Sequence, residues 1–157
     1  MDDVRKFLVI ADASEESATA AYFAARRAKH SGGRVTLLAV IEPSNFEHWL
    51  GVGETMRREA TEMAENALES LAEEVEAVTG GRPEMILREG ELLPTLRAVI
   101  EEDERIAILV LAAAKADDAP GPLISTLARG RGLFTGRRIP VTVVPGTLSR
   151  EEIDRLA

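Results

Sequence analysis

Short apolar runs of strand length alternate along this chain with segments of helical character. The clearest run is Ile106 to Ala112, which reads I-A-I-L-V-L-A and contains no polar side chain. A strand that is apolar at every position is buried on both faces, as in a parallel sheet that carries helices above and below. The alternation therefore predicts an α/β fold.

We expect five strands, each followed by a turn signal or a helical segment. The first ends at Asp12, before Ala13-Ser14, and the second ends before Glu42-Pro43. Right-handed crossovers between such strands give an open parallel sheet with helices on both faces. We expect the first and fourth strands to be central. The expected strands lie near residues 5–12, 34–41, 83–87, 106–112 and 139–144.

Helix signals fill the intervals between these strands. Ser14 begins a segment with acids in its first turn, bases in its last turn and Gly32-Gly33 after it, which suits a helix dipole and its caps. Further helices are expected near 54–78, 92–102 and 123–133. Ser149 opens a capping box with Glu152. We therefore expect one domain over residues 1–146 and a tail helix within 147–157.

The composition of the chain excludes several classes of function. The chain has 157 residues and no cysteine, which suits a single core and excludes disulfides, zinc knuckles and a thiol nucleophile. The net charge of −8 disfavours a nucleic-acid binder, and no apolar run is long enough for a signal peptide or a membrane span. We expect a cytoplasmic protein with neither nucleic acid nor membrane as partner.

Ligands of open parallel sheets bind beyond the carboxyl ends of the strands. Asp12, Val40 and the loops after Leu87 and Ala112 occupy those positions. For Asp12 two interpretations stay open: its carboxylate holds the following turn and the Ser14 amide, or it contacts a ligand. No triad and no paired carboxylates stand out at a strand end, so the residues favour a non-enzymatic function.

Several spaced blocks together resemble the universal stress protein family. They are F-L-V-I-A-D-A-S-E-E-S, V-T-L-L-A-V-I-E-P, R-E-G-E-L-L-P-T-L, I-L-V-L-A and I-P-V-T-V-V-P, and they extend from Lys6 to Pro145. The resemblance implies the adenine nucleotide α-hydrolase-like fold, a sheet order of 3-2-1-4-5 and a two-fold dimer. Some members bind ATP or AMP. In those members the positions matched by Asp12 and Val40 line the adenosine pocket, and the glycine matched by Gly90 lets a turn approach the ligand.

The phosphate half of that family pattern is altered here. ATP-binding members hold phosphates with the loop G-x-x-G-x9-G-[ST], whereas this chain places Ala112, Lys115, Ser125 and Thr126 at the matching positions. A different register with Gly121 as the close-approach residue is an alternative. Without the glycines, backbone amides approach phosphate poorly, so we expect weak or absent nucleotide binding in which AMP competes nearly as well as ATP.

Two hypotheses of function follow. One is a non-enzymatic, dimeric stress-response module, and the alternative is an ATP- or AMP-binding sensor with slow ATP hydrolysis. The dimer is expected through the last strand, because an uncharged edge strand is an association hazard unless it is paired. Its residues are Val141, Thr142, Val143 and Val144, and the tail from Ser149 is a candidate clasp on the partner.

Two further segments have open interpretations. Phe46, His48 and Trp49 form either an apolar cluster over the core or a lid or partner contact. The basic run at 129–132, followed by Arg137 and Arg138, is either solvated or a phosphate contact.

Overall fold

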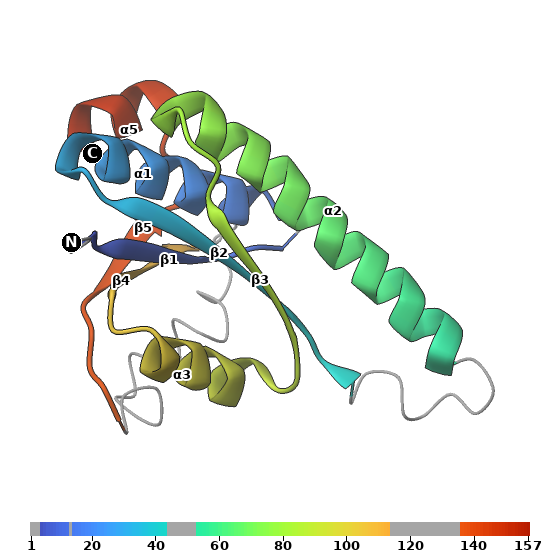
Figure 1. Cartoon of the computed structure of the whole chain (residues 1–157). Helices are drawn as coiled ribbons and strands as arrows, with labels where there is room; N and C mark the ends of the chain where they lie inside the picture. Colours follow the sequence, from blue (N-terminus) through green and yellow to red (C-terminus); the bar gives the residue numbers. More distant parts are fainter. Residues whose placement is uncertain (1–3, 13, 44–52, 114–135) are drawn as a thin grey trace.

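The computed structural model describes residues 4–12, 14–43, 53–113 and 136–157. Five parallel strands form one sheet in the order β3-β2-β1-β4-β5 (Figure 1). The predicted order is confirmed: β1 is the middle strand, and β4 is an interior strand beside it. The strands are β1 (Lys6–Ile10), β2 (Arg34–Ile41), β3 (Glu84–Glu89), β4 (Ile106–Ala113) and β5 (Val141–Pro145).

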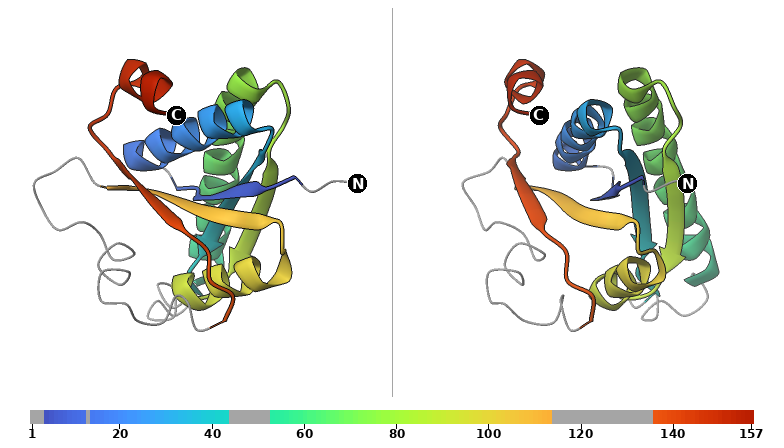
Figure 2. Two further views of the ribbon diagram at one scale, coloured as in Figure 1. Left: turned by 90° about the vertical axis from the view of Figure 1, so that its left-hand side faces the viewer. Right: turned by 60° about the vertical axis from the view of Figure 1, so that its left-hand side comes forward.

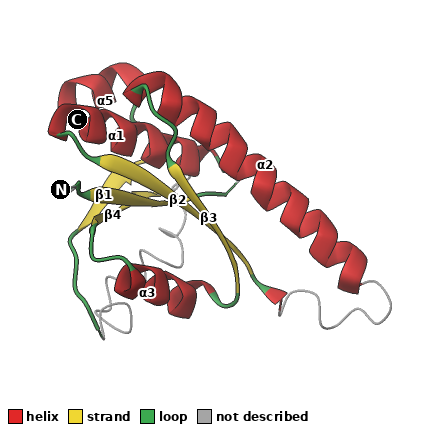
Figure 3. Cartoon of the chain, viewed as in Figure 1, coloured by secondary structure: helices red, strands yellow, loops and turns green. Residues whose placement is uncertain are grey.

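Helices cover both faces of the sheet, as the apolar strands require (Figure 3). Two long helices and the tail helix lie on one face, and a shorter helix lies on the other (Figures 1 and 2). The helix expected at 123–133 lies outside the described residues. The described helices are α1 (Glu15–Ser31), α2 (Gly53–Thr79), α3 (Leu92–Glu102) and α5 (Arg150–Leu156).

Two apolar cores flank the sheet, because successive strand residues point to opposite faces. Phe7 and Val9 of β1 pack with α1 and α2, whereas Leu8 packs with α3. Leu8 and Val9 are both fully buried, so β1 is covered on each side. The apolar runs of β1 and β2 thus have the burial that was predicted, whereas several residues of β4 are half-buried.

Three strand limits differ from the predicted ones by two residues. β1 ends at Ile10 rather than Asp12, because the Asp12 amide turns to the Ser17 hydroxyl. β3 continues to Glu89, which pairs with Ile41. β5 begins at Val141 rather than Ile139, since Pro140 has no N–H to give to a ladder.

The predicted caps are confirmed. The Ser14 side chain accepts from the Ser17 amide at 3.2 Å, and Gly32 ends α1 with φ of 73°, a left-handed conformation that glycine adopts without strain. At the tail, Ser149 and Glu152 form the expected capping box.

The tail helix packs against α1 of its own chain. Ile153 is buried, and the Tyr22 hydroxyl donates to Asp154 at 2.5 Å. This hydrogen bond is the main reason why the pKa of Tyr22 is raised. Arg26 also pairs with Asp154, at 3.2 Å, and the Arg150 guanidinium lies 4.6 Å from the centre of the Tyr22 ring. These contacts fix residues 149–157 on the α1 face (Figure 2).

A buried lysine holds the amino edge of the sheet together. Lys6 of β1 is 3% exposed, and its Nζ lies 3.1 Å from Glu84 of β3 and 2.5 Å from Asp103, which follows α3. The Thr36 hydroxyl of β2 also donates to Glu84, at 3.0 Å. One cation thereby joins a central strand, an edge strand and the end of α3.

A second cation caps the carboxyl end of α3, where the helix itself offers no basic residue. The Arg137 guanidinium donates to the carbonyls of Ile100 and Asp103 from Nη1 and to those of Glu104 and Ile106 from Nη2, at 2.5–3.2 Å. Four backbone acceptors are thus satisfied by one side chain. Arg137 is therefore neither solvated nor available to phosphate, while Arg138 beside it is exposed.

None of the helices in the described ranges combines the length and apolarity that crossing a bilayer requires.

The ion pairs of Lys6 lead to a prediction about acid. Burial by itself would raise the pKa of Asp103, but hydrogen bonds from Lys6 and from the Arg105 amide outweigh it and hold the pKa below its usual value. The stabilisation is therefore complete above the ordinary aspartate pKa of about 4 and is lost as the pH falls through the folded-state value. Asp103→Asn should lower the free energy of unfolding by about 1–3 kcal/mol near neutral pH.

Urea unfolding of the wild type and of Asp103→Asn, at about pH 7 and about pH 3, measures this effect. The difference in stability should shrink at the lower pH. Glu104→Gln, at an exposed neighbouring position, is the control and should behave as the wild type at both values. An equal loss for Asp103→Asn at both pH values would contradict the account.

Candidate functional site

The turn after β1 is built around two serines and Asp12. The Ser14 amide donates to Oδ1 of Asp12 at 2.8 Å, and the Ser14 hydroxyl donates to the same oxygen. The buried Ser17 hydroxyl donates to the Ile10 carbonyl at 2.8 Å and accepts from the Asp12 amide at 3.1 Å. Sequence reasoning did not single out Ser17, although a small hydroxyl three residues after an N-cap serine was the available signal.

Asp12 thus holds the turn, as the first of its two interpretations required. Its side chain is nonetheless exposed at the carboxyl edge of the sheet. One oxygen organises the turn, and a carboxylate at this position can still meet a ligand. Ligand contact by Asp12 stays a prediction.

The strand register brings Val40 and Ala112 to the same edge as Asp12. Ile10 pairs with Leu38, so Asp12 leaves the end of β1 at the same edge of the sheet as Val40. On the other side of β1, Val9 pairs with Val110, which places Ala112 level with the start of the same turn. Val40 and Ala112 are both half-buried. Three of the candidate positions therefore gather where the chain leaves β1, β2 and β4.

Gly90 follows β3 at this edge, and the structure gives an intrachain reason for glycine. Its φ is 151°, and a Cβ there would lie 2.8 Å from the Thr95 hydroxyl. Its amide donates to the Ile41 carbonyl at 2.9 Å. The tight turn into α3 therefore needs a residue without a side chain, whether or not a ligand approaches.

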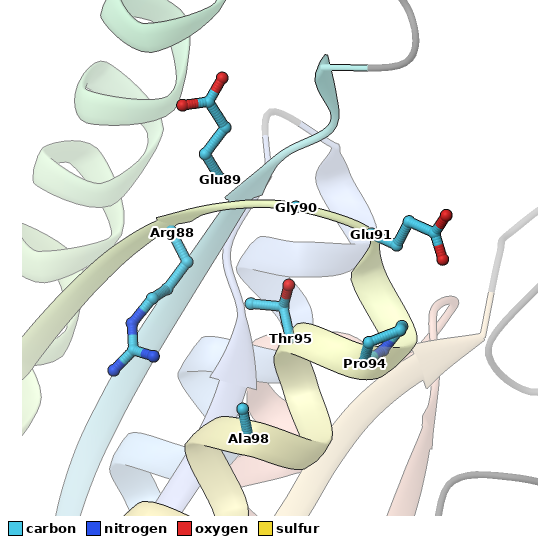
Figure 4. A pocket seen from close by; sticks show the side chains of 7 residues that line it. All are labelled: Arg88, Glu89, Gly90, Glu91, Pro94, Thr95 and Ala98. Atoms are coloured by element: carbon cyan, nitrogen blue, oxygen red, sulfur yellow. The ribbon is translucent and has the colours of Figure 1, made fainter.

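A shallow hollow of about 340 Å³ lies beside this turn, between the end of β3 and the first turns of α3 (Figure 4). Arg88 makes a bidentate pair with Glu102 at 2.6 and 3.1 Å, which raises the pKa of Arg88. Glu89 on the opposite side of the strand pairs with Arg57 of α2 at 3.0 Å. Arg88 and Glu89 are thus both engaged within the chain. The hollow is lined by Arg88, Glu89, Gly90, Glu91, Pro94, Thr95 and Ala98.

Other candidate residues lie outside the described residues. They are Lys115, Ser125 and Thr126 of the altered phosphate loop, the aromatic residues Phe46, His48 and Trp49, and the basic run at 129–132. Within the described ranges, no group of three or more acidic or histidine side chains is placed to hold a metal ion. His30 lies at the end of α1, on the amino side of the sheet.

Parallel strands in the order β3-β2-β1-β4-β5, helices on both faces and polar residues at the carboxyl edge define an α/β protein with the nucleotide α-hydrolase-like fold. A model of the universal stress protein family matches residues 3–130. The chain belongs to the universal stress protein family. Among curated proteins, none matches the sequence significantly.

Solved structures of universal stress proteins are similar to nearly the whole chain. UspA from Lactobacillus plantarum is 17% identical, with a TM-score of 0.72 over 92% of this chain and 99% of that one. A universal stress protein in complex with cAMP is 15% identical, with a TM-score of 0.63 over 92% and 98%. A universal stress protein from Archaeoglobus fulgidus is 19% identical, with a TM-score of 0.61 over 89% and 93%. At these identities the likeness shows the fold.

The geometry of Gly90 generates a prediction. Gly90→Ala should lower the free energy of unfolding by about 1–3 kcal/mol, because alanine is strained at this φ and its methyl group meets Thr95. Gly81→Ala is the matched control, because a Cβ added at Gly81 has nothing within 4 Å. This variant should unfold at a urea concentration no lower than that of the wild type. A Gly90→Ala protein as stable as the wild type would refute this description of the turn.

Proposed function

We propose that this universal stress protein is a dimeric, non-hydrolysing stress-response module of the cytoplasm. Its carboxyl edge takes adenine nucleotides weakly and mainly through their adenosine half. The observation that carries the proposal is the contrast between two halves of one edge. Asp12 is exposed at the edge where Val40 lies, whereas Ala112, Lys115 and Ser125 stand where ATP-binding members have glycines.

Family membership supports adenosine as the ligand moiety, and one structural neighbour is a complex with cAMP. That nucleotide carries a single cyclic phosphate and needs no extended phosphate cradle. A pocket that keeps its adenosine residues but lacks its phosphate loop suits such a ligand better than ATP.

The phosphate half argues against tight triphosphate binding. Ala112 places a methyl group at the end of β4, where a glycine lets backbone amides touch phosphate. Each lost charge-assisted amide contact removes on the order of 1.5–3 kcal/mol. Lys115 offers one flexible point charge and Thr126 one hydroxyl, which do not replace two or three such contacts.

Turnover would need an oriented water and charge stabilisation at the leaving phosphate. The second candidate function, a sensor with slow ATP hydrolysis, is favoured by the exposed carboxylate of Asp12 at the ligand edge. One carboxylate oxygen of Asp12 already accepts a hydrogen bond from the Ser14 amide, which argues against Asp12 as a free general base.

The proposed dimer forms through β5. The two edge strands of the sheet differ: β3 carries Glu84, Arg88 and Glu89, whereas β5 carries no charge. Val143 of β5 is 45% exposed in the single chain. An uncharged edge with an exposed β-branched residue is protected when its symmetry mate pairs with it.

Light scattering tests the dimer. The wild type should have about twice the chain mass of 17.0 kDa at tens of micromolar. Val143→Lys should halve the measured mass, because a lysine on an edge strand opposes pairing. Met85→Lys, at a comparably exposed position on β3, is the control and should keep the dimer. A measured mass near 17 kDa for the wild type would contradict the proposed dimer.

Calorimetric titration with ATP, ADP, AMP and adenosine tests the ligand. Binding should be weak for all four, with dissociation constants above about 10 μM, and AMP should bind within a few-fold of ATP. Asp12→Ala should weaken each ligand by a similar factor, because the lost contact belongs to the shared adenosine half.

Two results would overturn the proposal. Submicromolar ATP binding with a large preference over AMP would mean that the loop after β4 cradles phosphates. ATP turnover that persists in purified wild type and disappears in Asp12→Ala would favour the hydrolysing sensor.

A further inference from the structure

The central strands β1 and β4 stop pairing before the carboxyl edge of the sheet. Their register ends with Val9 beside Val110, whereas β4 stays paired with β5 as far as Ala113. The strand order also reverses between β1 and β4, because the chain returns across the sheet after β3. The ends of these two strands are therefore the place where an open parallel sheet receives a ligand.

A side-chain hydroxyl takes over from β4 at this point. The Ala11 amide donates to the Leu38 carbonyl of β2 at 2.7 Å, so the residue before it, Ile10, turns its backbone groups away from β2. Ile10 has no partner in the β1–β4 register, and its carbonyl accepts from the Ser17 hydroxyl of α1 at 2.8 Å. Ser17 thus supplies β1 with the donor that β4 no longer supplies.

Three hydrogen bonds close a ring around Asp12, and we call it the Asp12 ring. The Asp12 amide donates to the Ser17 hydroxyl at 3.1 Å, and the Ser17 amide donates to the Ser14 hydroxyl at 3.2 Å. The Ser14 amide donates to Oδ1 of Asp12 at 2.8 Å, which completes the ring. Each member donates through its amide and accepts through its side chain, so the Asp12 carboxylate cannot turn without the loss of a bond.

Capping of α1 explains Ser14 but not the hydroxyl of Ser17. An N-cap needs the side chain of the capping residue and only the amide of the residue three positions later, which every residue except proline has. Ser17 is 5% exposed, whereas Asp12 and Ser14 are exposed. The Ser17 hydroxyl donates to one backbone group and accepts from another, so it has no hydrogen left for a ligand.

We infer that Ser17 is a positioning residue of the adenosine site. Its hydroxyl ties the Asp12 turn to the end of β1 and so fixes the carboxylate, with Oδ1 held by Ser14 and Oδ2 left for the ligand. This inference rests on the proposed function. It assigns part of the adenosine affinity to a buried side chain that the ligand does not touch.

A double-mutant cycle tests whether Ser17 acts through Asp12. Ser17→Ala should weaken adenosine binding to the full chain by about two- to tenfold in calorimetric titration, because the turn loses a hydrogen bond on each side of the hydroxyl. In the Asp12→Ala background the same substitution should leave the adenosine affinity unchanged. A general loss of structure would instead weaken binding in both backgrounds.

Thr19→Ala is the matched control. The Thr19 hydroxyl also donates to a backbone carbonyl, that of Glu15 at 3.2 Å, but it is not a member of the Asp12 ring. Its removal should leave the adenosine affinity at the wild-type value. Ser17→Cys is the second test variant, because a thiol nearly fills the space of the hydroxyl but is a weak donor and acceptor. It should lose affinity as Ser17→Ala does, and urea unfolding checks that each variant is folded.

Three results would overturn the positioning role. If adenosine does not bind to the wild type, the proposed ligand is wrong and the role of Ser17 is wrong with it. If the wild type binds adenosine and both Ser17 variants bind it equally well, Ser17 positions nothing, while the proposed function stands. If the Ser17 variants lose the same factor with and without the Asp12 carboxylate, Ser17 supports the fold in general and does not act through Asp12.

Discussion

The buried ion pairs of Lys6 are the interaction on which the arrangement of the strands and α3 depends. A nearly buried ammonium is costly unless it is paired, and here Glu84 and Asp103 pair it from an edge strand and from the end of α3. Because β1 is central, this one group links a central strand, an edge strand and the residue that follows α3. The link acts together with the apolar packing of Leu96, Val99 and Ile100 to hold α3 on its face of the sheet.

The polar side chains at the two edges of the sheet consequently differ in their contacts. At the amino edge two cations bind partners within the chain: Lys6 pairs with two carboxylates, and Arg137 donates to four backbone carbonyls. At the carboxyl edge Asp12 stays exposed beside half-buried strand ends. The carboxyl edge is joined by the contacts of Ser14 with Asp12 and of Arg57 with Glu89, which leave part of the Asp12 side chain exposed.

Local patterns in the sequence were sufficient for most of the fold. Continuous apolar runs predicted the strands, and cap residues such as Ser14 and Ser149 predicted helix starts, because both are properties of neighbouring residues. The pairing of Lys6 with Glu84 joins residues 78 apart, and Arg137 binds carbonyls more than 30 positions away. No local pattern encodes such contacts. At the site, the register brings Asp12, Val40, Gly90 and Ala112 to one edge, as predicted, whereas their ligand contacts are not encoded by register.

The central claim is that the carboxyl edge of the sheet, and not the amino edge, receives the adenosine moiety. Amide chemical shifts of the ¹⁵N-labelled protein during an adenosine titration test this claim most directly. The account predicts perturbations at Ala11, Asp12, Val40, Gly90 and Ala112, with Arg34 and Arg105 unchanged. Perturbations confined to the amino edge, or none at saturating adenosine, would contradict it.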